Sequence, residues 1–230
     1  MRSKKRRAAT GGVLLLSSAA LVGSLASGVA TAVDDPTGLL ADGTDTHASL
    51  TQLNNSGVRG TSDVHVEGRR LDMHVDARRL LHDMPHAQHI HFGKQARHEC
   101  PTVRDDDNAD HRLNTAEGQP AYGPVKVSMT ARGPTGPGST LAVNRFPTAP
   151  DGEIHYDRKT RTEHEVARGI RRGNAVVVIH GLDYNHNGKY DFAGAGRSEL
   201  DPALPAEATD PVACGVLRPQ DAGLPLPAQQ

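Results

Sequence analysis

Large aromatic side chains are scarce in this sequence, which has no Trp, four Tyr and three Phe in 230 residues. A core built without them must consist of Val, Leu, Ile and Ala, a composition that favours β-branched strands over a large ligand-enclosing cage. Gly and Pro are also too few for a disordered low-complexity chain, since 24 Gly and 15 Pro fall below the roughly 25–30% that indicates one. Collagen, coiled-coil and multi-pass membrane proteins are excluded, and the length fits one globular domain.

Acidic residues are missing from the first 32 positions, where the sequence has the layout of a secretory signal peptide. Five basic residues lie within 1–7, a weakly apolar run follows at 11–26, and Ala-Thr-Ala at 30–32 matches a cleavage site. A membrane anchor is the alternative, but Ser and Gly interrupt the run, which is shorter than the roughly 20 apolar residues of a spanning helix. We therefore predict export of the cleaved chain to the extracellular space or the cell wall. The Arg-Arg pair at 6–7 permits a twin-arginine route.

The charge of the exported chain excludes nucleic acid as a partner. Residues 33–230 keep all 27 Asp and Glu but only 21 of the 26 Lys and Arg, which changes the net charge from −1 to −6. Binding to nucleic-acid phosphates needs a basic patch, which an acidic chain of this kind does not favour. The same segment keeps all 13 His, an unusually large number.

Only two cysteines are present, Cys100 and Cys214. In an exported chain a single pair is most simply explained as one disulfide. The bond would close a loop for which the chain-entropy model gives about 4–5 kcal/mol of stabilisation, less any strain. Two buried free thiols are the alternative.

Short stretches of alternating apolar and polar residues predict a β-rich fold. A hairpin is expected over 61–76, and the apolar, β-branched run 175–179 predicts a central strand buried on both faces. Further short strands are predicted at 89–91, 125–129 and 141–143. Together they indicate an antiparallel sandwich or barrel.

Other segments connect or flank these strands. Thr162 and Glu165 form a possible capping box, which predicts one short helix over 162–170. We interpret 33–56 as a loose leader, 101–120 as a long acidic loop and 218–230 as a flexible tail, so that the domain spans 57–217.

Histidines carry the clearest chemical signal. His89 and His91 are two apart on a predicted strand, so their side chains project from the same face. His180 ends the predicted central strand, at the rim of the core, and His98 is a further candidate because it lies two residues before Cys100. Imidazole suits copper and zinc, so these four residues predict a transition-metal site. Ordinary polar positions on an exposed strand face and a hydrogen-bonded strand end are the alternatives.

A second candidate metal site is a loop that resembles the first half of an EF-hand. Gly188 stands at position 6 of this loop. Oxygen-bearing side chains stand at positions 1, 3, 5 and 9, which are Asp183, Asn185, Asn187 and Asp191. The glutamate expected at position 12 is replaced by Gly194. The segment therefore predicts either a weak calcium site or a plain Asx turn.

Four segments, in this order, resemble the copper/zinc superoxide dismutases. His89-Ile90-His91-Phe92-Gly93 resembles the copper strand of that family, and the segment 174–181, with His180-Gly181 at its end, resembles a later strand that ends in another copper ligand. Cys100 and the segment 213–216 around Cys214 resemble its disulfide positions. The N-terminal part through Pro85–His89 resembles the related CHRD module. The resemblance covers about 55–217 and implies a Greek-key β-sandwich or barrel.

Departures from that family limit what the resemblance implies. Its bridging histidine is replaced by Asp106, its zinc loop retains only His111, and its guiding arginine is replaced by Pro211. A zinc site is therefore not expected, and the ligands that carry over are His89, His91 and His180.

The resulting hypothesis is an exported copper-binding protein of the superoxide dismutase type. Superoxide is the expected substrate, and dismutation should be slow because local positive charge, which focuses that anion, is reduced. The alternative is a non-catalytic CHRD-like module that binds a protein or a cell-surface ligand.

Overall fold

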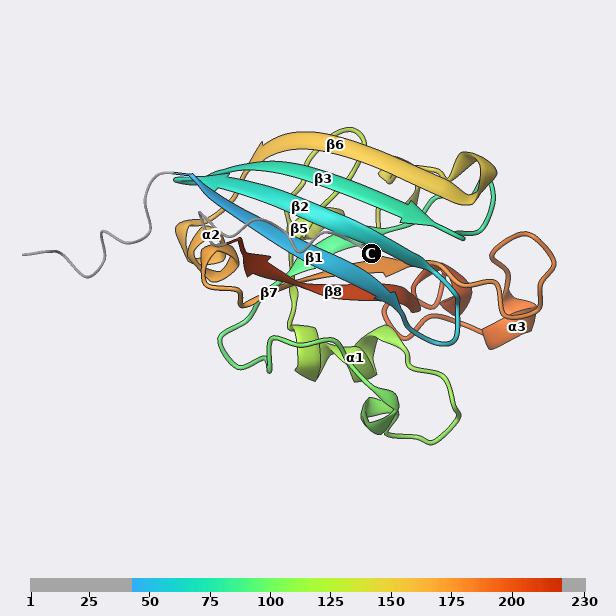
Figure 1. Cartoon of the computed structure of the whole chain (residues 1–230). Coiled ribbons are helices and arrows are strands. Elements are labelled where there is room, and N and C mark those ends of the chain that lie inside the picture. The colour runs from blue at the N-terminus through green and yellow to red at the C-terminus, as the bar shows by residue number, and fades with distance from the viewer. Residues whose placement is uncertain (1–42, 221–230) are drawn as a thin grey trace, which may run out of the picture. The chain divides into compact units, whose positions relative to one another are not determined.

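The computed structural model describes residues 43–220 (Figure 1). The predicted signal peptide at 1–32 and most of the predicted tail lie outside the described residues. Within the described range, eight strands form one antiparallel sheet in the order β5-β4-β7-β8-β1-β2-β3-β6. Their bounds are β1 Thr44–Gln52, β2 Arg59–Glu67, β3 Arg70–Arg78, β4 Gln88–His91, β5 Val125–Ser128, β6 Glu153–Arg161, β7 Ala175–His180 and β8 Pro211–Pro219.

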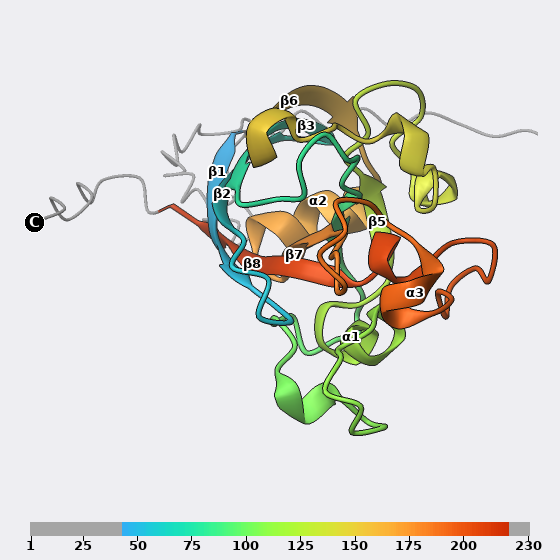
Figure 2. The same cartoon turned by 90° about the vertical axis from the view of Figure 1, so that its right-hand side faces the viewer.

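Short helices lie in the connections between strands. Helix α1 (Thr115–Tyr122) precedes β5, α2 (His164–Arg171) precedes β7, and α3 (Phe192–Ala195) lies between β7 and β8. Helix α2 buries Val166 and Ile170 in the main hydrophobic core, and Figure 2 shows the sheet bending around this helix. No helix in residues 43–220 is long and apolar enough to cross a membrane.

The sheet curls because its alternating side chains bury one face. In the β2–β3 hairpin the inward positions include Val64, Val66 and Val75, all at most 1% exposed. Strand β7 is buried at every position, as predicted for a central strand. Both the hairpin and the central strand are thus confirmed.

The two edges of the curled sheet meet through side chains. Thr135, which follows β5, shares a hydrogen bond of 2.6 Å with Thr160 of β6. Arg158 of β6 donates to the Thr130 hydroxyl at 2.7 Å, and the Tyr156 hydroxyl donates to the Thr130 carbonyl at 3.3 Å. Among the described residues β5 and β6 are not paired with each other through their backbones, so the architecture is an eight-stranded antiparallel half-barrel.

The prediction of a loose leader over 33–56 was wrong for its second half. Residues 44–52 form β1, which pairs with β2 and β8 in the middle of the sheet. Its inward side chains are Thr46, Ala48 and Leu50, of which only one is a large apolar residue. Alternation was present in this segment but was weak in hydrophobic contrast.

Two further predictions need correction. Residues 141–143 do not form a strand; Val143–Arg145 form a 3-10 turn instead. The long loop at 101–120 ends early, because α1 begins at Thr115 behind a capping box between Asn114 and Glu117. This helix contains Gly118 and Pro120 and shows no amphipathic pattern, so periodicity did not reveal it.

The predicted short helix is confirmed as α2, although its N-terminus differs. The N-cap residue is Glu163, which makes no capping side-chain hydrogen bond, so the expected Thr162–Glu165 capping box does not form.

A disulfide between Cys100 and Cys214 confirms the predicted pairing and excludes two free thiols. It connects the loop after β4 to the fully buried middle of β8, across a sequence separation of 114 residues. The bond is consistent with an extracytoplasmic location.

Candidate metal centre

Three histidines converge inside the folded unit. His89 and His91 lie on β4, and His180 ends β7, the antiparallel neighbour of β4. Because side chains alternate along a strand, His89 and His91 point to the same side of the sheet. A register irregularity between Ile179 and His180 marks the end of regular pairing between β7 and β8. One ring nitrogen of each histidine lies within 4.8 Å of the other two.

Backbone carbonyls determine which nitrogen of each ring is free. His89 Nε2 lies 3.2 Å from the Thr140 carbonyl, His91 Nδ1 lies 2.7 Å from the Gly123 carbonyl, and His180 Nδ1 lies 2.6 Å from the Thr209 carbonyl. A carbonyl oxygen only accepts, so each of these nitrogens carries the proton in the neutral ring.

The opposite nitrogen of each ring carries a lone pair and accepts no hydrogen bond within the described part of the chain. His89 Nδ1, His91 Nε2 and His180 Nε2 are buried, and none has a hydrogen-bond partner among the described residues. A buried polar atom without a partner is costly, and three that converge need a common partner. A metal ion fits this donor set, and the carbonyl bonds on the far side of each ring are the usual supports of ligating histidines.

Burial keeps these rings neutral. It lowers the pKa of His91 to about 3 and that of His180 to about 4, and it lowers the pKa of His89 well below its ordinary value. The mutual repulsion of the positive charges adds to this effect at His89 and His91. Neutral imidazole is the form that ligates metal, so the site is ready to bind without losing protons at neutral pH.

Aromatic rings hold two of the imidazoles in place. Tyr122 packs on His91 at 4.4 Å between ring centroids, and Phe146 packs edge-on to His89 at 5.1 Å. Sequence reasoning missed both residues. It also missed His86, which is fully buried and whose Nδ1 lies 2.8 Å from the carbonyl oxygen of His180. No local motif marks such packing partners.

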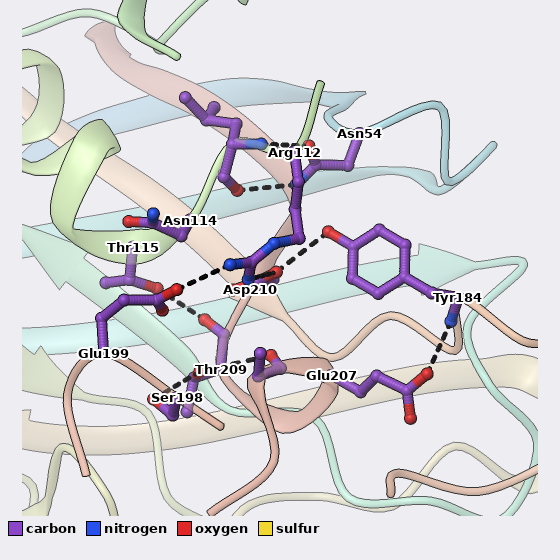
Figure 3. A network of polar contacts seen from close by, with 12 residues as sticks. Asn54, Arg112, Asn114, Thr115, Tyr184, Ser198, Glu199, Glu207, Thr209 and Asp210 are labelled. Atoms are coloured by element: carbon purple, nitrogen blue, oxygen red, sulfur yellow. Dashed lines mark hydrogen bonds and ion pairs between the residues drawn. The ribbon is translucent and has the colours of Figure 1, made fainter. Parts of the chain in front are cut away.

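A polar network holds the loop before α1 against the segment that leads into β8 (Figure 3). Arg112 donates to Asp210 at 2.8 Å and to Glu199 at 2.7 Å, and the Tyr184 hydroxyl also donates to Asp210, at 2.9 Å. Asp210 follows Thr209, whose carbonyl faces His180. The network therefore supports the backbone that orients one of the three rings.

His98, the fourth predicted ligand, is not brought to this cluster. Its ring instead stacks on Phe92, with centroids 5.8 Å apart and planes 15° apart. The cluster of the described residues contains His89, His91 and His180 alone.

The predicted calcium loop forms a compact turn held by its own hydrogen bonds. The Asp183 carboxylate accepts from the backbone N–H groups of Asn187 at 3.2 Å and Gly188 at 2.8 Å. Asn185 and Asn187 donate from their amides to the Asp191 carboxylate, at 3.2 and 2.6 Å. Such bonds are also those of an Asx turn, so calcium binding by this loop stays a prediction.

Four other histidines lie on the outer face of the half-barrel. Each ring is within 2.8 Å of a carboxylate on a neighbouring strand: His47 with Asp63, His65 with Asp45, His74 with Asp157 and His155 with Asp76. These pairs account for part of the high histidine content without a metal.

Comparison of the chain with protein-family models and with curated proteins finds no match.

Proposed function

We propose that the protein binds one copper ion through His89 Nδ1, His91 Nε2 and His180 Nε2. Two observations carry the proposal: one ring nitrogen of each histidine lies within 4.8 Å of the other two, and each ring has one buried nitrogen without a hydrogen-bond partner in residues 43–220. Neutral imidazoles that already donate to carbonyls on their far side need no rearrangement to serve as ligands.

Copper is favoured over zinc by the chemistry of the donors. All three donors are nitrogens, and no carboxylate or thiolate belongs to the cluster among residues 43–220. For a given nitrogen site, affinity rises along the first-row divalent ions to a maximum at Cu²⁺. The likeness of the β4 and β7 sequences to a copper-binding family points the same way.

The finer proposal is a superoxide dismutase-like protein with a Greek-key barrel, exported from the cell. Copper would supply a one-electron redox couple when bound. The chain's own contribution is to hold three imidazoles in fixed orientation and to cover them with Tyr122 and Phe146. Positive charge near such a site concentrates an anionic substrate. We expect dismutation to be slow, because Pro211 stands where the resembled family has its guiding arginine.

Copper loading of the purified protein tests the proposal. We expect about one Cu²⁺ per chain by elemental analysis, and nitrogen hyperfine structure in the electron paramagnetic resonance spectrum. The double change His89→Ala/His91→Ala should abolish binding. His111→Ala is the matched control, because this exposed histidine lies outside the cluster and its loss should leave binding intact.

Three results would contradict the proposal. One is copper that remains in the double variant but is lost from His111→Ala, which would place the site elsewhere. Another is a wild-type protein that retains zinc in direct competition with copper. The third is a protein that binds no metal, which would favour the non-catalytic binding module instead.

A further inference from the structure

Apolar side chains close over the histidine cluster. The opening above the rings is lined by Val125 at the start of β5, by Leu141 and Val143 in the connection to β6, and by Leu200 and Ala208 in the connection to β8. Leu141 and Leu200 are 36% and 39% exposed, and they are two of the four large hydrophobic residues that lie exposed in residues 43–220. Together with the two valines, these leucines place apolar carbon at the rim of a buried polar cluster.

The space under this rim is very small. Its volume is about 20 Å³, which holds about one water-sized molecule. The wall is joined to the cluster at one point, since Leu141 follows Thr140, whose carbonyl accepts from His89. A ligand of more than two or three heavy atoms would have to displace the rim.

Charge is missing from the lining as far as the structure describes it. Apart from the three histidines, the lining residues are apolar or are threonines: Ala87, Thr115, Val125, Thr140, Leu141, Val143, Leu200, Ala208 and Thr209. The nearby cation Arg112 is already bound to Asp210 and Glu199. An anion that enters such a lining loses its hydration and gains no counter-charge from the wall, so that the bound metal alone would attract it, whereas a small uncharged molecule loses little hydration.

We infer that the opening lined by Val125, Leu141, Val143 and Leu200 selects a small uncharged ligand, of the size and polarity of a diatomic gas, against anions. The inference rests on the proposed copper site and deepens it: superoxide, the anionic substrate proposed above, would reach the copper poorly, which is a further reason to expect slow dismutation. Access is controlled by the loops rather than by the metal ligands.

Two probes test the preference in the copper-loaded protein. Carbon monoxide is the uncharged probe, added to the Cu⁺ form and followed by its infrared stretch. Azide is the anionic probe, added to the Cu²⁺ form and followed by absorption and paramagnetic resonance. We expect carbon monoxide to bind fully and azide to bind only weakly.

Charge placed at the rim should change the result for the anion alone. In Leu141→Lys/Leu200→Lys we expect azide affinity to rise about tenfold or more, because each ammonium lies near the bound anion in a medium of reduced dielectric constant. The matched control is Val103→Lys, which adds a lysine at a residue 90% exposed and outside this lining. Copper content and hyperfine splitting are measured first in every variant.

The outcomes separate the two proposals. A chain that fails to take up copper contradicts the proposed function, and this inference with it. A chain that holds copper but whose Cu²⁺ form binds azide as tightly as a copper–imidazole complex in free solution contradicts the inference alone, because that comparison keeps the oxidation state the same. So does a rim variant whose azide affinity rises no more than that of Val103→Lys.

Discussion

At the scale of single residues, backbone carbonyls determine the tautomer and the orientation of the three clustered histidines. The carbonyls of Gly123 and Thr140 come from the segments on either side of β5, and that of Thr209 comes from the segment before β8. Each one selects a tautomer, because it can only accept a hydrogen bond. The rings are therefore set in binding form by segments distant from them in sequence.

The low pKa values of His91 and His180 predict how the apoprotein responds to acid. A pKa lowered from about 6.5 to about 3 or 4 means that the unfolded chain takes up protons that the folded chain does not. The stabilisation is complete above about pH 6.5 and is lost as the pH falls toward 4. We expect the free energy of unfolding, measured in urea at several pH values, to decline over that range.

A variant isolates the contribution of one ring. In His91→Gln the slope of the unfolding free energy against pH should be smaller, by an amount that corresponds to at most one bound proton. His111→Ala should keep the wild-type slope. An unchanged slope in His91→Gln would show that this imidazole is not held neutral.

The ligand residues could be predicted from the sequence, whereas their hydrogen-bond partners could not. His89 and His91 follow from strand periodicity, and His180 follows from its place at the end of a buried strand. Carbonyl groups exist at every position and carry no sequence signal, so the roles of Gly123 and Thr209 were invisible. Proximity to a cysteine in sequence made His98 a candidate, but its ring turns to Phe92 instead.

At the scale of elements, Arg112 joins two long connections. It brings the loop between β4 and α1 into contact with Asp210 and Glu199 from the connection between β7 and β8. Asp210 is completely buried, whereas the Arg112 side chain is 17% exposed. Burial raises the pKa of Asp210 to about 7, although Arg112 and Tyr184 lower it.

Arg112→Ala should destabilise the protein in a pH-dependent way. Without the guanidinium the pKa of Asp210 rises further, so the buried carboxyl stays protonated in weak acid and becomes a buried charge in weak base. A raised carboxyl pKa gives stability that is present at low pH and lost as the pH rises. We expect a loss of roughly 3 kcal/mol at pH 8 and a smaller loss at pH 5.

Two variants make the test specific. Arg112→Lys should recover part of the loss, because an ammonium supplies the charge without the two-pronged geometry. Arg104→Ala removes an exposed arginine from the same loop and should have little effect. Equal losses at both pH values would contradict the role given to Asp210.

Element prediction succeeded where hydrophobic contrast was strong. The β2–β3 hairpin and β7 carry Val, Ile, Leu and Met at their inward positions, and both were located from the sequence. Strand β1 has Thr and Ala at two of its inward positions, so its alternation was hard to recognise. Helix α1 begins at a capping box between Asn114 and Glu117, which is a local feature, whereas the burial of Tyr122 is a tertiary one.

At the scale of the whole molecule, the disulfide fastens the loop after β4 to β8. In the chain-entropy model, a cross-link over this separation contributes about 4–5 kcal/mol. We expect Cys100→Ala/Cys214→Ala to unfold at lower urea concentration by a comparable free energy. Alanine is preferred to serine because Cys214 is fully buried and a hydroxyl there would lack a partner.

Reduction of the wild-type protein provides an independent route to the same state. It should reproduce the stability of the double alanine variant, since both remove the same restraint on the unfolded chain. If the reduced wild-type protein and the alanine variant are both as stable as the oxidised protein, the bond does not stabilise the fold.

The three clustered histidines and the residues that line the opening above them belong to different parts of the chain. The histidines lie on β4 and β7, inside the sheet, whereas the rim residues Leu141, Val143 and Leu200 lie in loops. Loops accept substitution and insertion more readily than central strands. Single substitutions at the rim could therefore change which ligand enters, whereas exchange of a whole loop would also remove carbonyls such as that of Thr140, which orient the histidines.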